Sequence, residues 1–290
     1  MPVVAVVNRK GGSGKSTLAT HLAAYFAKRG AAVMLADIDR QQSTRTWLRQ
    51  RKAATPEGSA IIGWSVDPRT FVRPPSGADL VVLDTPGGLT GFDLARVVMY
   101  ADAILMPVCN SIFDRESAAD CLAELRLLPR VATGRCRIGA VGMRLDASTE
   151  AADTVQSWAA EQRLPLLTLL RESAAYVRCI EKGLTLFDAP AVEVEDDLAQ
   201  WKPILHWLRP VLESPANDPA PTRPHEIPAA RAARTDRQPA QSVHRPAAPV
   251  LARPLRSLEP APRATVASPI NPMSRLLGTL PIPRFLQRTP

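Results

Sequence analysis

Short apolar runs alternate with amphipathic segments along the first 212 residues of the chain. Runs of four to seven apolar residues with little polar alternation predict strands that are covered on both faces. They lie at residues 3–7, 32–37, 61–66, 80–84, 103–108, 137–143 and 166–169. Helical segments lie between and after these runs, at residues 15–29, 43–52, 92–101, 114–128, 149–162, 173–182 and 194–212. This order predicts an α/β fold with a mostly parallel, doubly wound sheet and helices on both faces.

The last 77 residues of the chain, 214–290, differ in composition from the rest. They contain 16 of the 28 prolines and 11 arginines, but only four acidic residues and no lysine, tyrosine or tryptophan. Such a segment cannot bury enough apolar surface to offset its chain entropy. We therefore expect a folded domain over residues 1–213 and a disordered tail over residues 214–290. The tail carries +7 of the net charge of +8, so the expected domain is nearly neutral.

Composition also indicates where the protein works. No stretch approaches the roughly 20 consecutive apolar residues that a membrane-spanning helix needs, and no signal-peptide pattern precedes the first apolar run. The four cysteines, at positions 109, 121, 136 and 179, have neither a C-x-x-C nor a metal-ligand spacing. These features predict reduced, buried thiols in a cytoplasmic protein.

A glycine-rich segment joins the first predicted strand to the first predicted helix. Its glycines allow backbone N–H groups to turn toward a phosphate, and the helix N-terminus adds partial positive charge. Lys15 would reach the β- and γ-phosphate oxygens, and Ser16 would bind Mg²⁺. Arg9 stands where an ordinary P-loop has glycine, and a second lysine, Lys10, precedes the glycine pair. The predicted nucleotide-binding residues are Lys10, Gly11, Gly12, Ser13, Gly14, Lys15, Ser16 and Thr17.

Carboxylates close two of the predicted strands. Asp37 and Asp39 end the second strand, and Asp84 follows four apolar residues and precedes Thr-Pro-Gly-Gly. Ligands of an open α/β sheet bind at the carboxyl ends of its strands, where an aspartate can hold Mg²⁺ opposite the P-loop serine. A helix cap or turn is the alternative role, and the neighbouring P-loop favours the metal. We predict that Ser16 and Asp84 contribute to a metal site.

Together these motifs resemble the deviant Walker A ATPases, the ParA/MinD group. The resemblance covers about residues 2–212, and it is closer to the ParA partition branch because of the sequence 39–43 and the downstream Trp47. It is carried by the lysine-first P-loop, the Asp-x-Asp-x-Gln run at 37–41, Leu83-Asp84-Thr85-Pro86, residues 101–108 and, more weakly, residues 183–187.

The resemblance implies a role for each matching residue. Lys10 would cross an ATP-sandwich homodimer to contact the partner's nucleotide, and Lys15 would hold the phosphates within its own subunit. Asp39 would orient the attacking water, which makes Lys10, Lys15 and Asp39 the predicted catalytic residues. ATP and Mg²⁺ are the implied cofactors, and the implied metal-site residues are Ser16, Asp37 and Asp84. Phosphoryl transfer depends on positioning and charge neutralisation, so a lysine from the second subunit would link hydrolysis to dimerisation.

Two positions depart from the family pattern. The family often has Asn-Arg at the end of the sixth strand, with the asparagine near adenine, whereas this chain has Met143-Arg144. The pattern therefore does not indicate which residues contact the base. Arg40 stands where a proline is common.

The family also implies partners. Its members are slow ATPases whose ATP-bound dimer binds DNA nonspecifically and whose partner protein, a centromere-binding protein or cargo adaptor, stimulates hydrolysis. The candidate DNA-binding residues are Arg171, Arg178 and Lys182, of which the last two are four residues apart and share a helix face. An ordinary solvated helix face is the alternative. The resemblance thus implies a nucleoid-associated switch that positions or segregates a DNA or protein cargo.

Other interpretations remain open. The arginine-rich tail would either add affinity for DNA or capture a partner. A MinD-like membrane-surface ATPase that positions a division or polymer-synthesis complex needs a C-terminal amphipathic helix, which Pro281 and Pro283 would interrupt. A P-loop metabolic enzyme, related to cobyrinate amidases or nitrogenase reductase, is less favoured. The latter would need cluster-ligating cysteines.

Overall fold

The structure of the chain is a computed structural model that describes residues 1–39, 43–55, 61–66 and 74–213. The proposed tail at 214–290, Arg40 and Gln41 lie outside the described residues. The division into a domain and a disordered tail therefore stays a prediction. Of the helices in the described part, none combines the length and apolar character that a bilayer-spanning segment needs.

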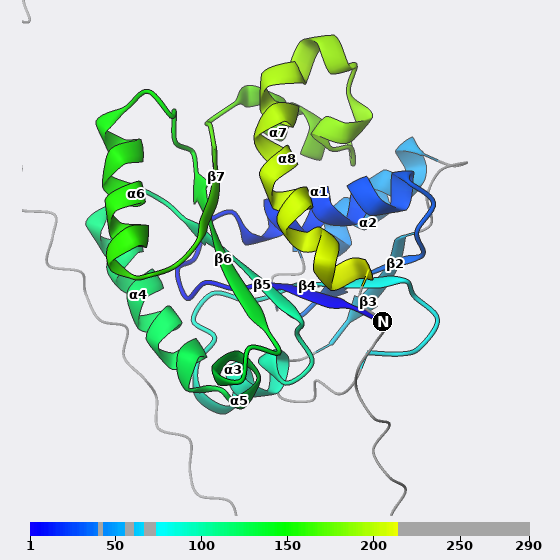
Figure 1. Ribbon diagram of the computed structural model, residues 1–290. Coiled ribbons are helices and arrows are strands. Elements are labelled where there is room, and N and C mark those ends of the chain that lie inside the picture. The colour runs from blue at the N-terminus through cyan, green and yellow to red at the C-terminus, as the bar shows by residue number, and fades with distance from the viewer. Residues whose placement is uncertain (40–42, 56–60, 67–73, 214–290) are drawn as a thin grey trace, which may run out of the picture. The chain divides into compact units, whose positions relative to one another are not determined.

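Seven parallel strands form the sheet of the described domain, in the order β3-β2-β4-β1-β5-β6-β7 (Figure 1). This arrangement confirms the predicted fold class, and every predicted strand is present within one residue at either end. The strands are β1 Val3–Val6, β2 Val33–Asp37, β3 Ile61–Ser65, β4 Leu80–Asp84, β5 Ala103–Val108, β6 Arg137–Met143 and β7 Leu166–Leu170.

The seven predicted helices are also present, with ends that differ by up to three residues. The short α5 begins with a proline at its first position, which suits that residue, and was not predicted. A second unpredicted element is a 3₁₀ turn, η2, closed by a capping box between Thr185 and Asp188. The helices are α1 Lys15–Lys28, α2 Ser43–Ala54, α3 Gly91–Val98, α4 Ile112–Leu127, α5 Pro129–Ala132, α6 Glu150–Glu161, α7 Ala174–Ile180 and α8 Ala191–Glu213, and η2 is Leu186–Asp188.

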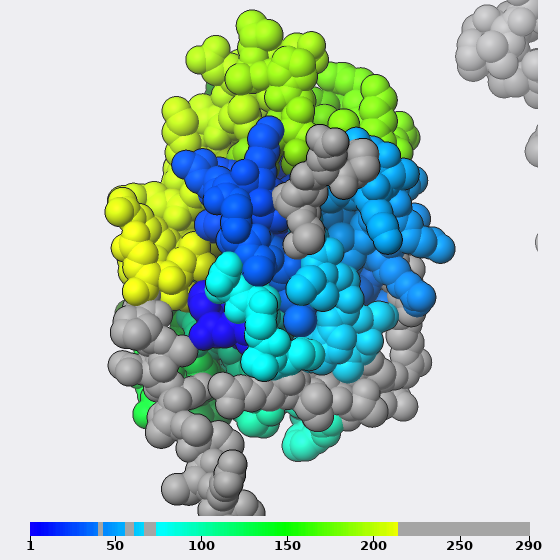
Figure 2. Space-filling model, turned by 90° about the vertical axis from the view of Figure 1, so that its right-hand side faces the viewer, coloured from blue at the N-terminus to red at the C-terminus, as the bar shows by residue number. Residues whose placement is uncertain are grey.

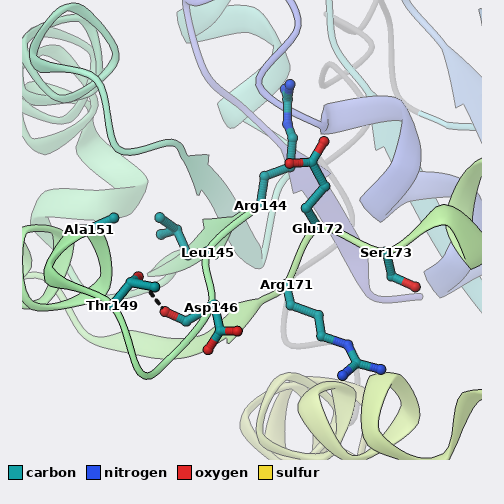
Figure 3. A pocket seen from close by; sticks show the side chains of 8 residues that line it. All are labelled: Arg144, Leu145, Asp146, Thr149, Ala151, Arg171, Glu172 and Ser173. Carbon is teal, nitrogen blue, oxygen red and sulfur yellow. Dashed lines mark hydrogen bonds between the residues drawn. The ribbon is translucent and has the colours of Figure 1, made fainter.

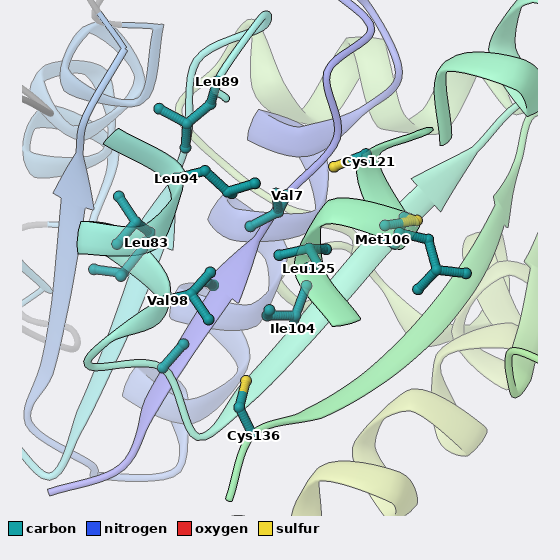
Figure 4. Packing of buried hydrophobic residues seen from close by; sticks show 14 of the residues in the cluster. Val7, Leu83, Leu89, Leu94, Val98, Ile104, Met106, Cys121, Leu125 and Cys136 are labelled. Carbon is teal, nitrogen blue, oxygen red and sulfur yellow. The ribbon is translucent and has the colours of Figure 1, made fainter. Parts of the chain in front are cut away.

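The sheet separates two apolar cores, as the unalternating strand pattern predicts. Alternate residues of one strand face opposite sides: Ala5 belongs to the core under α3, α4 and α6, whereas Val6 belongs to the core under α1, α2, α7 and α8. Figure 4 shows part of the first core, with Leu94 and Val98 of α3 and Leu125 of α4. Burial of a single large aliphatic side chain contributes about 1.5–3 kcal/mol. Two of the cysteines, at positions 121 and 136, are fully buried and the other two are half-buried, so the prediction of buried thiols is only partly right.

The carboxyl ends of the central strands meet at one edge of the sheet. The strand β1 lies between β4 and β5, so the P-loop that follows β1 has the ends of both neighbours beside it. Asp37 and Asp84 are paired residues at the ends of β2 and β4. The topology therefore gathers the predicted phosphate and metal residues at one edge.

Candidate nucleotide-binding site

The loop between β1 and α1 adopts a conformation that only glycine accommodates easily. Gly12 and Gly14 have φ values of +72° and +99°, in the left-handed region that other residues rarely adopt. A Cβ atom on Gly14 would also lie 2.5 Å from the Cε atom of Met143. Asn8 fixes the start of the loop, because its side chain accepts from the Lys10 N–H at 3.0 Å and donates to the Pro107 carbonyl at 2.6 Å. Asn8 was not among the predicted site residues.

The side chains of the two lysines in the loop differ in their exposure to solvent. The Lys15 side chain is buried, and its Nζ donates to the Lys10 carbonyl at 2.9 Å. Burial lowers the pKa of Lys15, and the carboxylates of Asp84 and Asp39 oppose this effect. The Lys10 side chain is exposed to solvent. Lys15 is therefore held inside the cradle, whereas Lys10 is available to a molecule outside it.

Asp84 is the most unusual group at this edge. It is completely buried, and among the described residues neither of its carboxylate oxygens has a hydrogen-bond partner. Burial raises the pKa of Asp84 to about 7, the nearby Ser16 and Lys15 oppose the rise, and Asp37 adds to it. A buried acceptor without a donor is costly, so the site favours a bound cation.

Asp37 is also buried, but both of its oxygens are engaged by the backbone. Oδ1 accepts from the Asp39 N–H and Oδ2 from the Arg45 N–H, each at 3.1 Å. The second bond caps the first turn of α2. Asp37 therefore organises the chain that follows β2, and its predicted contact with the metal stays a prediction. Asp39 is half-buried, and its charge acts on both Lys15 and Asp84.

The residues present fit a phosphate-bound Mg²⁺ better than a metal held by protein alone. Within residues 1–39, 43–55, 61–66 and 74–213, no group of three or more His, Cys, Asp or Glu side chains could hold a metal. Asp84 and the Ser16 hydroxyl supply only two oxygen ligands, and Mg²⁺ usually takes further oxygens from water and substrate phosphates. The two Asp84 oxygens, which have no hydrogen-bond partner among the described residues, support this assignment.

A cavity of about 490 Å³ lies beside the P-loop, between the loops that follow β6 and β7 (Figure 3). Arg144 lines it, adopts a left-handed φ of +58° and donates a guanidinium hydrogen bond to the Gly12 carbonyl. Asp146, in the loop after β6, and Glu172, in the loop after β7, also line this cavity. The sequence pattern placed Arg144 at the end of the sixth strand but did not indicate Asp146 or Glu172, because their position depends on how the two loops face each other.

The comparisons with known proteins agree with this geometry. A family model described as the CobQ/CobB/MinD/ParA nucleotide binding domain matches residues 4–186. The chain belongs to this family. Residues 4–6 of the first strand and the whole P-loop lie at the start of this match.

The chain is also similar to individual relatives and to solved structures. Maintenance of carboxysome distribution protein A of Gloeobacter kilaueensis is 32% identical over 192 residues, which are 63% of this chain and 83% of that protein. The chromosome-partitioning ATPase Soj of Thermus thermophilus is 30% identical over 154 residues, covering 42% of this chain and 60% of Soj. The apo McdA structure from Cyanthece has the same fold, with a TM-score of 0.57, 17% identity and coverage of 73% of this chain and 99% of that one.

The predicted DNA-binding residues are only partly brought together in this family domain. Arg178 on α7 and Lys182 just after it are exposed. Arg171, at the end of β7, instead donates from Nε to the buried Asp197 at 2.6 Å and pairs with Asp196 at 3.5 Å. The charge of Arg171 is thus engaged by α8, and of the three candidates Arg178 and Lys182 are the exposed ones.

Proposed function

We propose that the chain is an ATP-dependent dimerising switch whose ATP-bound dimer binds nonspecific DNA and positions or segregates a DNA or protein cargo. The observation that carries this proposal is the contrast between the two P-loop lysines. Lys15 is buried on the cradle, whereas Lys10 is exposed at its rim. An exposed lysine beside the cradle would be able to contact a nucleotide held by a second copy, which supports the proposal.

The proposed chemistry is slow hydrolysis of ATP to ADP and phosphate. Lys15 would neutralise the β- and γ-phosphate oxygens, and the N–H groups of the loop would hold them in place. Mg²⁺, when bound, would neutralise phosphate charge, and Ser16 and Asp84 would hold it. Asp39 would orient the attacking water, since its carboxylate lies close enough to influence both Lys15 and Asp84.

The cavity beside the P-loop supports a position for the nucleoside. Asp84 and Asp39 lie on the β4 and β2 side of β1, whereas the cavity lies on the β6 and β7 side. A triphosphate whose terminal phosphate faces the carboxylates would extend its nucleoside toward the cavity. Met143 packs near Gly14 and offers no strong hydrogen-bonding group to a base. Asp146 and Glu172 are therefore the acceptors proposed for the exocyclic amine of adenine.

Contacts between the nucleotide edge and α7 support a link between ATP and DNA binding. Trp47 on α2 donates from Nε1 to the Leu184 carbonyl at 3.2 Å, and His21 on α1 accepts from the Leu186 N–H at 3.3 Å. The 183–188 segment that receives these contacts directly follows α7 and Lys182. The two helices that begin at the site therefore hold the segment beside the exposed pair Arg178 and Lys182.

The relatives indicate the biological setting that we propose. Proteins named for carboxysome distribution and chromosome partitioning share the family with this chain. A cytoplasmic, nucleoid-associated role, with a partner protein that stimulates hydrolysis, is consistent with both. A membrane-surface ATPase would instead bind lipid vesicles in an ATP-dependent manner and ignore DNA.

Sedimentation with a slowly hydrolysed ATP analogue and Mg²⁺ tests the proposal. The unmodified chain should form a dimer. Lys10→Ala should still bind the analogue but remain monomeric. Lys52→Ala, which removes an exposed lysine from α2, is the matched control and should dimerise normally. An unchanged dimer fraction in Lys10→Ala would exclude the role of Lys10 between subunits.

A further inference from the structure

Arg9 joins three separate segments at the nucleotide edge. Its guanidinium forms an ion pair with Glu124 on α4, and the side chains of the two residues are 26% and 22% exposed. The other carboxylate oxygen of Glu124 accepts from the Gly91 N–H at the start of α3. The Arg9 carbonyl accepts from the Gly88 N–H at 2.7 Å. The P-loop, α4 and the 85–91 segment after Asp84 therefore meet at one arginine.

The close approach of the 85–91 segment leaves little room at this junction. A Cβ atom on Gly87 would lie 3.4 Å from the Arg9 carbonyl oxygen and 3.4 Å from the Gly11 backbone. Gly87 is thus packed directly against the start of the phosphate cradle. A shift of the 85–91 segment would move backbone that touches both Arg9 and Gly11.

The ion pair with Glu124 also neutralises the positive charge of the Arg9 guanidinium. The Nε atom of Arg9 is buried and has no hydrogen-bond partner among the described residues. Glu124 is the carboxylate that the structure pairs with this guanidinium. Removal of Glu124 would leave a partly buried positive charge uncompensated, and the loop would have to rearrange to hydrate it.

We propose that Arg9 and Glu124 are positioning residues for ATP hydrolysis. This inference rests on the proposed function. The 85–91 segment directly follows Asp84, which would hold the metal, and it contacts the cradle that would hold the phosphates. The ion pair fixes the distance between these two elements, and neither residue contacts the reacting atoms. Misplacement by about 1 Å can lower a rate by roughly 100-fold without removing any catalytic group.

The test is the ATP turnover of Glu124→Gln in the full chain. This variant keeps an acceptor for the Gly91 N–H but removes the charge that pairs with Arg9. We expect kcat to fall by about 10- to 100-fold, with KM for ATP changed by less than about 3-fold. Glu116→Gln, an exposed change on the same helix, is the control and should leave turnover unaltered. Equal losses in both variants would overturn the proposal.

A double-mutant cycle tests whether the two residues act together. If Arg9→Gln and Glu124→Gln were independent, their effects on kcat would multiply. We expect the double variant to be no less active than the less active of the two single variants, because either change breaks the same contact. Arg9→Lys, which keeps the charge, should recover part of the activity. Multiplying effects would overturn the proposed pairing.

Backbone hydrogen exchange of the nucleotide-free chain separates this inference from the proposed function. Glu124→Gln should accelerate exchange within residues 85–91 and leave β6 unchanged. Unchanged exchange in 85–91 would overturn the positioning role, whatever the turnover. Faster exchange with normal kcat would also overturn it. Absence of ATP turnover in the unmodified chain would overturn the proposed function, while faster exchange would still support the junction.

Discussion

Arg51 on α2 and Asp188 in the 3₁₀ turn form a two-point ion pair, with N–O distances of 2.8 and 3.2 Å. Their side chains are only 4% and 11% exposed. The Gly183 carbonyl is a further acceptor for the Arg51 guanidinium. Gly183 has a φ of +71°, and a Cβ atom there would lie 2.3 Å from the backbone nitrogen of Arg51. The segment after α7 therefore packs against α2 without space for a side chain. Figure 2 shows the blue α1 and α2 regions directly against this yellow-green part of the chain.

Loss of the Arg51–Asp188 pair should strongly destabilise the domain. Asp188→Ala leaves a buried guanidinium without its carboxylate, which costs about 3–5 kcal/mol of unfolding free energy. Urea denaturation followed by circular dichroism measures the change. Asp196→Ala is the control, because Asp196 is 81% exposed and its ion pair should contribute only about 0–1 kcal/mol. Similar losses in both variants would contradict the importance of burial.

Acid should weaken the domain through His21. Burial lowers the pKa of His21 to about 4 from its ordinary 6.5, so between these values the unfolded chain binds a proton that the folded chain excludes. The unfolding free energy should therefore fall as pH drops from 6.5 to 4, by up to about 1.4 kcal/mol per pH unit from this residue. His21→Gln should lose this contribution. Parallel pH profiles for the two proteins would show that His21 does not titrate as expected.

Asp39→Ala should separate hydrolysis from nucleotide binding. A residue that orients water acts chiefly in the transition state, so its loss lowers turnover more than affinity. We expect kcat to fall by about 100-fold or more, while the ATP-bound dimer accumulates. Phosphate release and sedimentation measure the two effects. Equal turnover in variant and unmodified protein would remove Asp39 from the mechanism.

DNA binding should depend on α7 and on ATP. The double change Arg178→Glu and Lys182→Glu should abolish binding to unrelated duplexes without preventing dimerisation. Arg171→Gln should weaken DNA binding far less, because Asp197 already engages that guanidinium. Binding by the unmodified protein should fall steeply between about 50 and 200 mM salt. Filter binding with and without ATP measures these effects.

A chain that ends at Glu213 distinguishes the domain from residues 214–290 in the same assay. We expect the shortened chain to bind DNA only with ATP. If it dimerises but fails to bind, the remaining residues carry the DNA contacts. If the full chain binds vesicles and no DNA, the membrane-surface alternative replaces the proposed function.

The sequence predicted those parts of the site that follow from local rules. Glycine spacing located the phosphate cradle, and parallel strands bring Asp37 and Asp84 to one edge. Pairings between distant side chains were not predictable. Arg9 and Glu124 are 115 positions apart, and Arg51 and Asp188 are 137 apart, so nothing in the local pattern selects either partner.

The three candidate DNA-binding residues show why helix periodicity alone could not predict which basic side chains are exposed. Arg178 and Lys182 are both exposed, but Lys182 lies beyond the end of α7 at Ile180, so the predicted shared helix face is not formed by one helix. Arg171 lies at the end of a strand, and its direction is set by Asp197 on a later helix. Charge in the sequence therefore identified candidates, but tertiary contacts determine which charges are free.

The division of the domain into two cores has a consequence for signalling. The P-loop after β1 continues into α1 on the layer that contains α2, α7 and α8, whereas the segment after Asp84 continues into α3 on the layer of α4 and α6. A molecule bound between Lys15 and Asp84 therefore bridges the start of both layers. Two macromolecules bound on opposite faces of the sheet could therefore both respond to binding at this site, each through its own helical layer and without contacting one another.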